Sequence, residues 1–162
     1  MALESLLLGI EDSVIGVAVR ENATLFPAFE AIHVVGLTLV VGSIAAIDLR
    51  LLGLSARKHA VTKMSAELLP WTWGAFALAA FSGLVLFTSA ATGYVANPAF
   101  LIKMGLLFAA ALNMVIFHFI TWRTVHHWDE ETTTPTGAKV AGGLSLLFWV
   151  GVVTFGRWVG FV

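Results

Sequence analysis

The sequence contains no cysteine and few charged residues, and both absences narrow what the protein can do. Without cysteine it has no structural disulfide, no thiolate-bound metal and no thiol nucleophile. Charged residues make up 12% of the chain and the formal net charge is −1, without a run of basic residues, so no nucleic-acid partner is expected. Neither a glycine-rich phosphate loop nor a Gly-x-Ser-x-Gly nucleophile motif occurs, which argues against nucleotide and acyl chemistry.

The sequence consists largely of long apolar segments. Hydrophobic residues form 59% of the sequence and the mean hydropathy is +0.91, values typical of an integral membrane protein. A helix of about 20 apolar residues crosses a hydrocarbon core of roughly 30 Å, whereas an open sheet would leave its backbone groups unsatisfied there. We therefore predict an all-α fold, a four-transmembrane-helix bundle that forms one domain over residues 1–162 and contacts the lipid bilayer. The predicted transmembrane helices cover residues 25–52, 70–92, 98–122 and 138–161, with Pro27, Pro70 and Pro98 in the first turns of the first three.

Residues 1–22 predict a further, amphipathic helix. Its apolar positions at helical spacing are Leu3, Leu6, Leu7, Ile10, Val14 and Val17, and acidic residues lie opposite them. The pattern suits a helix in the membrane interface and, equally, a helix packed against the bundle. Because no basic residue precedes the apolar run, the segment is not expected to be a signal peptide.

The charges of the loops predict an orientation. The basic residues near the first and third loops are Arg50, Arg57, Lys58, Lys63, Arg123 and Lys139, and the second loop has none. The positive-inside rule therefore places the first and third loops in the cytoplasm and both termini outside.

Ionisable residues inside membrane helices are costly and usually functional. At 1.5 Å per residue from the entry prolines, His33 and Lys103 lie ~8–9 Å deep, and Asp48 and His118 lie ~30 Å deep. The predicted outer layer comprises Glu30, His33, Lys103 and Arg157, and the predicted inner layer comprises Asp48, Arg50 and His118. A metal–imidazole bond is about 2 Å long, so two histidines ~20 Å apart in depth cannot bind the same ion.

His33 and His118 are the candidate metal ligands, each either an axial ligand of haem iron or a hydrogen-bonded structural histidine. Lys103 and Arg157 are candidates to hold haem propionates, or alternatively to pair with Glu30 and reach toward lipid headgroups. Glu30 and His33 form one Glu-x-x-His motif, whereas a di-iron bundle needs two such motifs and two further glutamates, so a di-iron site is disfavoured.

Asp48 and Arg50 are expected to form an ion-pair network at the inner boundary that supports a cofactor there. A proton-relay role for Asp48 is the alternative interpretation.

Four blocks carry a resemblance to a known family: "HVVGLTLVVGSIAAIDLRLLGL", "LLPWTWGAFALAAFSGLVLF", "NPAFLIKMGLLFAAALNMVIFH" and "AGGLSLLFWVGVVTFGRW". In this order they resemble DUF6644, a bacterial family of four-helix membrane proteins without an established reaction. More distantly, His33 and Lys103 match positions in membrane protoporphyrinogen oxidases that bind haem b, and the chain is similar to copper-resistance D-type membrane proteins. The resemblance implies a bacterial inner-membrane location and favours haem.

The leading hypothesis is a b-type haem protein that transfers electrons, with one or two haem b groups per subunit. His33 would ligate an outer haem and His118 a second, inner one. A redox partner or quinone would exchange electrons, and a homo-oligomer would supply or cover the open face of each layer. The alternatives are a membrane porphyrin-ring oxidase, a copper-handling or transport protein, and a structural membrane subunit.

Overall fold

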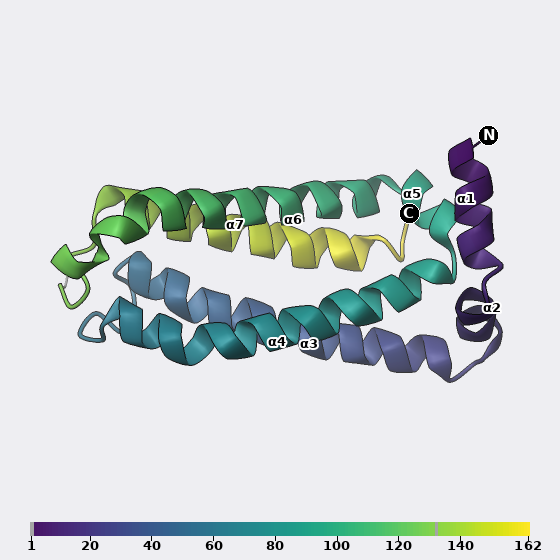
Figure 1. The fold of residues 1–162 in the computed structure, drawn as a ribbon, viewed down its shortest axis with the longest axis horizontal. Helices are drawn as coiled ribbons and strands as arrows, with labels where there is room; N and C mark the ends of the chain where they lie inside the picture. The colour runs from purple at the N-terminus through teal and green to yellow at the C-terminus, as the bar shows by residue number, and fades with distance from the viewer. Residues whose placement is uncertain (1, 132) are drawn as a thin grey trace.

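The computed structural model describes residues 2–131 and 133–162, and within them it is helical and has no strand (Figure 1). The long helices are α3 (Leu25–Leu51), α4 (Val61–Thr88), α6 (Pro98–Ile116) and α7 (Thr136–Trp158). The shorter elements are α1 (Ala2–Glu11), α2 (Val14–Glu21), α5 (Ala91–Ala96), the π-helical turn η1 (Phe117–Thr121) and the 3₁₀ helix η2 (Trp122–His127). The first, second and fourth long helices, and the continuous span Pro98–His127, are long and apolar enough to cross a membrane. The predicted all-α, four-span architecture is therefore confirmed, and its apolar exterior contacts lipid.

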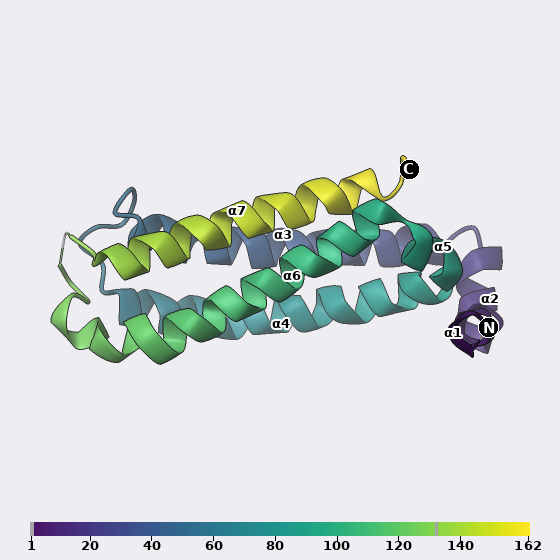
Figure 2. The same ribbon diagram turned by 90° about the horizontal axis from the view of Figure 1, so that it is seen from above.

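Two antiparallel helix pairs build the bundle. Helix α3 pairs with α4 and α6 pairs with α7, while α7 also packs against α3 and joins the two pairs (Figures 1 and 2). Small residues allow close approach: a Cβ at Gly36 would lie 3.1 Å from the Ala75 carbonyl oxygen, and one at Gly142 would lie 3.1 Å from that of Asp48. The end that carries α1, α2 and α5 is named the N-terminal end, and the opposite end, with η2 and the α3–α4 loop, is named the loop end (Figure 1). The predicted outer layer lies toward the N-terminal end and the predicted inner layer toward the loop end.

The N-terminal segment forms two helices instead of the predicted single one. The chain breaks between them because the Ser13 hydroxyl accepts a hydrogen bond from the Gly16 amide at 3.1 Å and so caps α2. Both helices lie across the end of the bundle, with α1 nearly perpendicular to the long helices (Figure 1). Leu7 and Val19 are buried against the bundle, whereas Val14 is 89% exposed. The segment thus both packs on the bundle and presents apolar side chains outward, as an interfacial helix requires.

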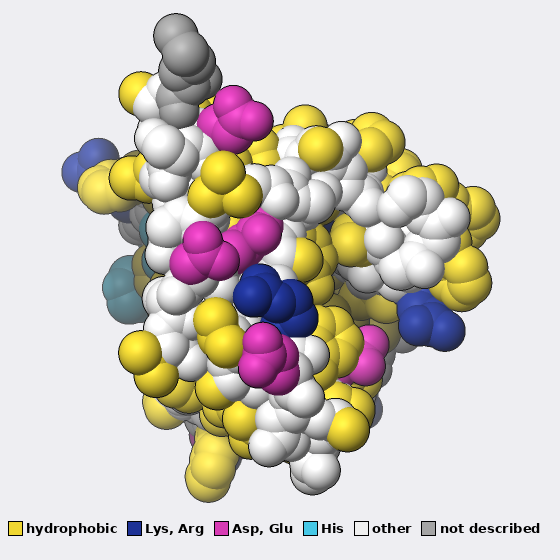
Figure 3. Space-filling model, turned by 90° about the vertical axis from the view of Figure 1, so that its right-hand side faces the viewer, with side chains coloured by type: hydrophobic (Ala, Val, Ile, Leu, Met, Phe, Trp, Pro, Cys, Tyr) yellow, Lys and Arg dark blue, Asp and Glu magenta, His cyan; other side chains and the backbone are white. Residues whose placement is uncertain are grey.

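Glu11 ties this segment to α5. Its carboxylate accepts hydrogen bonds from the Thr92 amide and hydroxyl, both at 2.6 Å, and these bonds lower the pKa of Glu11. Figure 3 views this end of the molecule and shows acidic side chains among the hydrophobic ones around the N-terminal helices.

Helix α4 begins nine residues before the predicted start at Pro70, so that prediction was wrong: α4 begins at Val61 and Pro70 lies inside it. The start is capped by a distant residue, because Asp129 accepts hydrogen bonds from the Thr62 amide at 2.8 Å and the Thr62 hydroxyl at 2.5 Å. Partial desolvation raises the pKa of Asp129, but the hydrogen bonds from Thr62 and Val61 and the charge of Arg50 together outweigh it and leave the pKa below its ordinary value. A cap supplied from so far along the chain leaves no signal in the local sequence.

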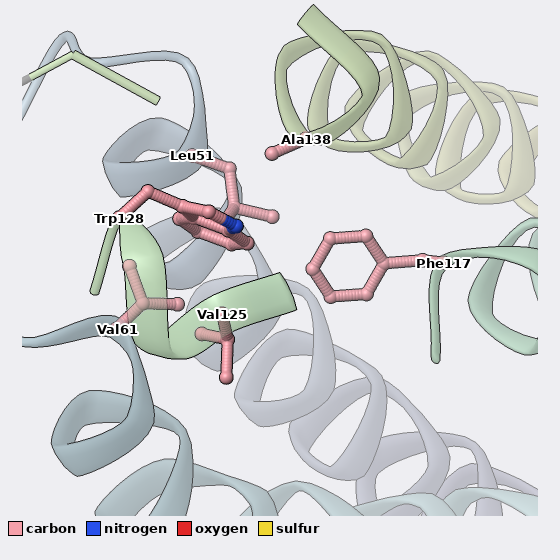
Figure 4. Close-up of a cluster of buried hydrophobic side chains, with 6 residues drawn as sticks. All are labelled: Leu51, Val61, Phe117, Val125, Trp128 and Ala138. Atoms are coloured by element: carbon pink, nitrogen blue, oxygen red, sulfur yellow. The ribbon is translucent and has the colours of Figure 1, made fainter. Parts of the chain in front are cut away.

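A buried apolar cluster closes the loop end. Figure 4 shows its side chains converging from three long helices, from the η1 and η2 turns and from the residue that follows η2: Leu51, Val61, Phe117, Val125, Trp128 and Ala138. This cluster fixes where α6 passes into η1, and therefore where His118 lies.

Candidate functional site

His33 lies on α3 and turns toward α4. Its Nδ1 is 2.7 Å from the Ala79 carbonyl oxygen and 3.4 Å from the Ser82 hydroxyl. A carbonyl only accepts, so Nδ1 carries the proton of the neutral ring and Nε2 carries the lone pair. Gly83 leaves the space for the ring, since a Cβ there would lie 2.9 Å from His33 Cε1. The imidazole is thus fixed in the tautomer that a metal ligand needs.

Lys103 is the charged neighbour of His33. The lysine is half-buried on α6, its positive charge acts on His33, and its Nζ would lie 3.6 Å from a Cβ at Gly156 of α7. Among the residues that the structure describes, no carboxylate forms an ion pair with Lys103. A cation without a partner at this depth is a ready binding group for an anion.

Glu30 and Arg157 lie at the margin of this layer. Glu30 is exposed, and its charge adds to burial in raising the pKa of Tyr94 in α5. Arg157 is also exposed, and its guanidinium carbon lies 5.1 Å from the centre of the Phe161 ring. His33 and Lys103 therefore form the central pair of the layer.

An apolar cavity of about 490 Å³ occupies the other half of the bundle, between the two helix pairs. Residues of all four long helices and of the η1 and η2 turns line it, among them the aromatic side chains Trp73, Phe76, Phe108, Trp122 and Trp149. The predicted inner residues Asp48 and His118 both face this cavity. Its volume suits a small organic ligand or cofactor.

Asp48 is buried, with 5% of its surface exposed. Ser145 of α7 lines the cavity beside it, and among the described residues the Oδ2 atom is buried without a hydrogen-bond partner. A buried polar atom without a partner is rare in a folded protein, because it keeps the cost of desolvation. Asp48 is therefore the group in this cavity that most clearly has hydrogen-bonding capacity left for a ligand.

His118 approaches the cavity from the π-helical turn. Its Nδ1 lies 2.9 Å from the Met114 carbonyl oxygen, so the lone pair of the neutral ring is again on Nε2. The ring stacks on Trp122 with centroids 5.6 Å apart. Such π-helical turns within α-helices often occur at functional sites, because they redirect a side chain.

Arg50 does not face the cavity, and the expected ion pair with Asp48 is not formed. Residues two apart on a helix point to different sides. The guanidinium is fully buried and donates hydrogen bonds to the carbonyl oxygens of His59 at 2.8 Å, Asp129 at 3.0 Å and Glu131 at 3.1 Å. Arg50 therefore links the α3–α4 loop to the loop between η2 and α7.

Comparison of the chain with known proteins shows which family it belongs to. The model of DUF6644, described as a family of unknown function, matches residues 8–162. The chain belongs to the DUF6644 family. No curated protein and no solved structure gives a significant match to it.

In this DUF6644 protein, the described residues contain no group of three histidine, aspartate or glutamate side chains that could hold a metal ion. A haem needs only one or two axial ligands, so the finding bears on copper and di-iron sites more than on haem. Sequence reasoning missed Gly83 and Ser145, which shape the surroundings of His33 and Asp48. Both look like ordinary packing residues in a membrane helix, and no local pattern distinguishes them.

Proposed function

We propose that this protein binds haem b beside His33 and transfers electrons within the bacterial inner membrane. The observation that carries the proposal is the His33 ring, whose Nδ1 is held 2.7 Å from the Ala79 carbonyl oxygen so that Nε2 is free to ligate iron. The same arrangement orients metal-binding histidines in general, since a backbone acceptor fixes the tautomer and makes the ligand more basic.

Lys103 supports the same site. Haem carries two propionates, and Lys103, an unpaired lysine whose charge acts on His33, would supply the positive charge that one of them needs. Arg157 follows Gly156, at which an added Cβ would contact the Lys103 side chain. The Arg157 guanidinium could hold the second propionate if it moved away from the Phe161 ring. The fit rests on the donor set: a neutral imidazole that presents a lone pair, and a cation without a counter-ion.

The bound haem would supply one-electron redox chemistry, and the protein would set its position and electrostatics. His33 would bind and orient the group, and Lys103 would stabilise its anionic edge. The positive charge of Lys103 would also favour the reduced state of the iron.

His118 is the weaker of the two candidate haem ligands. Its Nδ1 is held in the same manner, and the cavity offers room. Among the described residues that line the cavity, however, there is no lysine or arginine to pair with a propionate, and an ionised Asp48 would repel one. One haem per subunit, at His33, is therefore the version we favour over two.

The proposal includes the topology and assembly. Basic residues at the loop end favour a cytoplasmic loop end, which leaves both termini outside. A symmetric homo-oligomer would cover the haem edge that the four helices do not enclose, and a redox partner would exchange electrons with it.

A visible spectrum of the detergent-purified protein from haem-replete cells tests the proposal. The reduced-minus-oxidised spectrum is expected to show a b-type α-band. A colourless preparation would refute the haem assignment, and stoichiometric copper without porphyrin would favour the copper-handling alternative.

A further inference from the structure

The cavity between the helix pairs opens toward lipid. Phe108 on α6 and Trp73 on α4 both line it, yet they are 73% and 54% exposed, so they form its rim on the lipid-facing surface. A ligand can therefore enter sideways from the acyl-chain region of the bilayer. This entry route selects a lipid-soluble molecule over a water-soluble one.

Asp48 determines which hydrogen-bonding group a ligand of the cavity must carry. Its carboxyl lines the cavity together with Ser145, and the Oδ2 atom is buried without a hydrogen-bond partner among the described residues. A carboxyl oxygen accepts a hydrogen bond when the group is ionised and donates one when it is protonated. The group can therefore satisfy a ligand hydroxyl in one state and a ligand carbonyl in the other.

Further polar groups face the same space, and two of them have an atom available to a ligand. The Asn113 side-chain amide donates to the Ala141 carbonyl oxygen at 2.9 Å, which leaves its own carbonyl oxygen available, and His118 offers the lone pair on Nε2. Aromatic side chains form much of the remaining wall. The cavity thus combines flat apolar surfaces with polar groups from all four long helices and from η1.

We infer that this cavity binds a lipid-soluble quinone and its quinol, with the Asp48 carboxyl hydrogen-bonded to one ring oxygen. A quinone carbonyl accepts and a quinol hydroxyl donates, so the two redox forms match the two protonation states of one carboxyl. A permanently charged lipophilic cation would bind well only while Asp48 is ionised. A quinone or quinol is neutral and can hydrogen-bond to Asp48 in either protonation state. The inference does not depend on a haem at His33, because it rests on Asp48, Asn113 and His118 and not on His33 or Lys103.

The test uses the full-length protein in lipid nanodiscs and a benzoquinone with a decyl tail as the probe. Quenching of tryptophan fluorescence reports binding, because Trp73, Trp122 and Trp149 line the cavity. Asp48→Leu removes the hydrogen-bonding group and is expected to weaken binding about tenfold or more. Asp48→Asn keeps the shape and a donor, and is expected to bind within about threefold of the wild type.

A matched control comes from the same helix. Thr38 is exposed on α3 and its hydroxyl bonds to the Val34 carbonyl oxygen, so Thr38→Val should leave binding unchanged. His33→Ala should also leave it unchanged, which separates failure of this inference from failure of the haem proposal. Far-ultraviolet circular dichroism checks that each variant folds.

Three results would overturn the inference. The first is no saturable binding of the decyl-benzoquinone by the wild type. The second is equal affinity in the wild type and a folded Asp48→Leu variant. The third is Asp48-dependent binding of tetraphenylphosphonium without binding of the quinone, which would assign the cavity to a lipophilic cation.

Discussion

The imidazole of His33 occupies the space beside Gly83, with its Cε1 atom 2.9 Å from where a Cβ at residue 83 would be. The absence of a side chain at Gly83 of helix α4 therefore allows the His33 ring to lie where it does. The contact is with the end of a side chain and not with backbone, so a larger residue at position 83 would move the ring before it disturbed the helix pair.

Gly83→Ala is accordingly expected to lower the haem content while the helical content stays the same. The added methyl group costs about 1–3 kcal/mol if the imidazole stays in place, and the ring is expected to move instead. Haem per polypeptide and circular dichroism measure the two effects separately. Gly74→Ala is the control on the same helix, because nothing lies within 4 Å of a Cβ there.

Gly16 is a second position where backbone approaches closely. A Cβ at Gly16 would lie 2.5 Å from the Glu11 carbonyl oxygen and 2.7 Å from the Thr88 carbonyl oxygen. Backbone cannot yield as a side chain can, so Gly16→Ala is expected to destabilise the docking of α2 on the bundle by about 1–3 kcal/mol. Faster proteolysis within the first 24 residues would show the loss of docking, and Gly9→Ala, with nothing within 4 Å, should cleave at the wild-type rate.

Arg50 is expected to stabilise the loop end through its three carbonyl bonds. Lysine has the charge but not the planar fork, so Arg50→Lys should lower the free energy of unfolding by about 1.5–3 kcal/mol. Denaturant titration in mixed detergent micelles measures the loss. The exposed Arg57 bonds to the Gly53 carbonyl oxygen within its own loop, and Arg57→Lys should cost far less. Equal losses in the two variants would contradict the role assigned to Arg50.

The cap on α4 predicts a loss of stability in acid. The pKa of Asp129 is lower in the folded protein than its ordinary value of 3.8, so its contribution is complete above that value and is lost as the pH falls through the folded pKa. The melting temperature of the wild type should therefore drop more between pH 6 and pH 3 than that of Asp129→Asn, which lacks the ionisable cap at every pH. The neighbouring exposed Glu130→Gln variant should keep the wild-type pH dependence.

The sequence predicted the membrane architecture well because that architecture depends on composition and on the length of the apolar runs. It also placed Asp48 and His118 at one depth, and both face the same cavity. The start of α4 was wrong because Asp129, far along the chain, caps that helix and Pro70 is accommodated inside it. The partners of Arg50 could not be predicted either, because they are backbone carbonyls of loops whose path depends on the fold.

The direct test of the haem proposal is the haem content per polypeptide in three proteins purified identically. The wild type is expected to carry about one haem b, His33→Ala to lose it, and His118→Ala to keep it, since His33 would be the residue that ligates the iron. Full haem content in a folded His33→Ala protein would contradict the account.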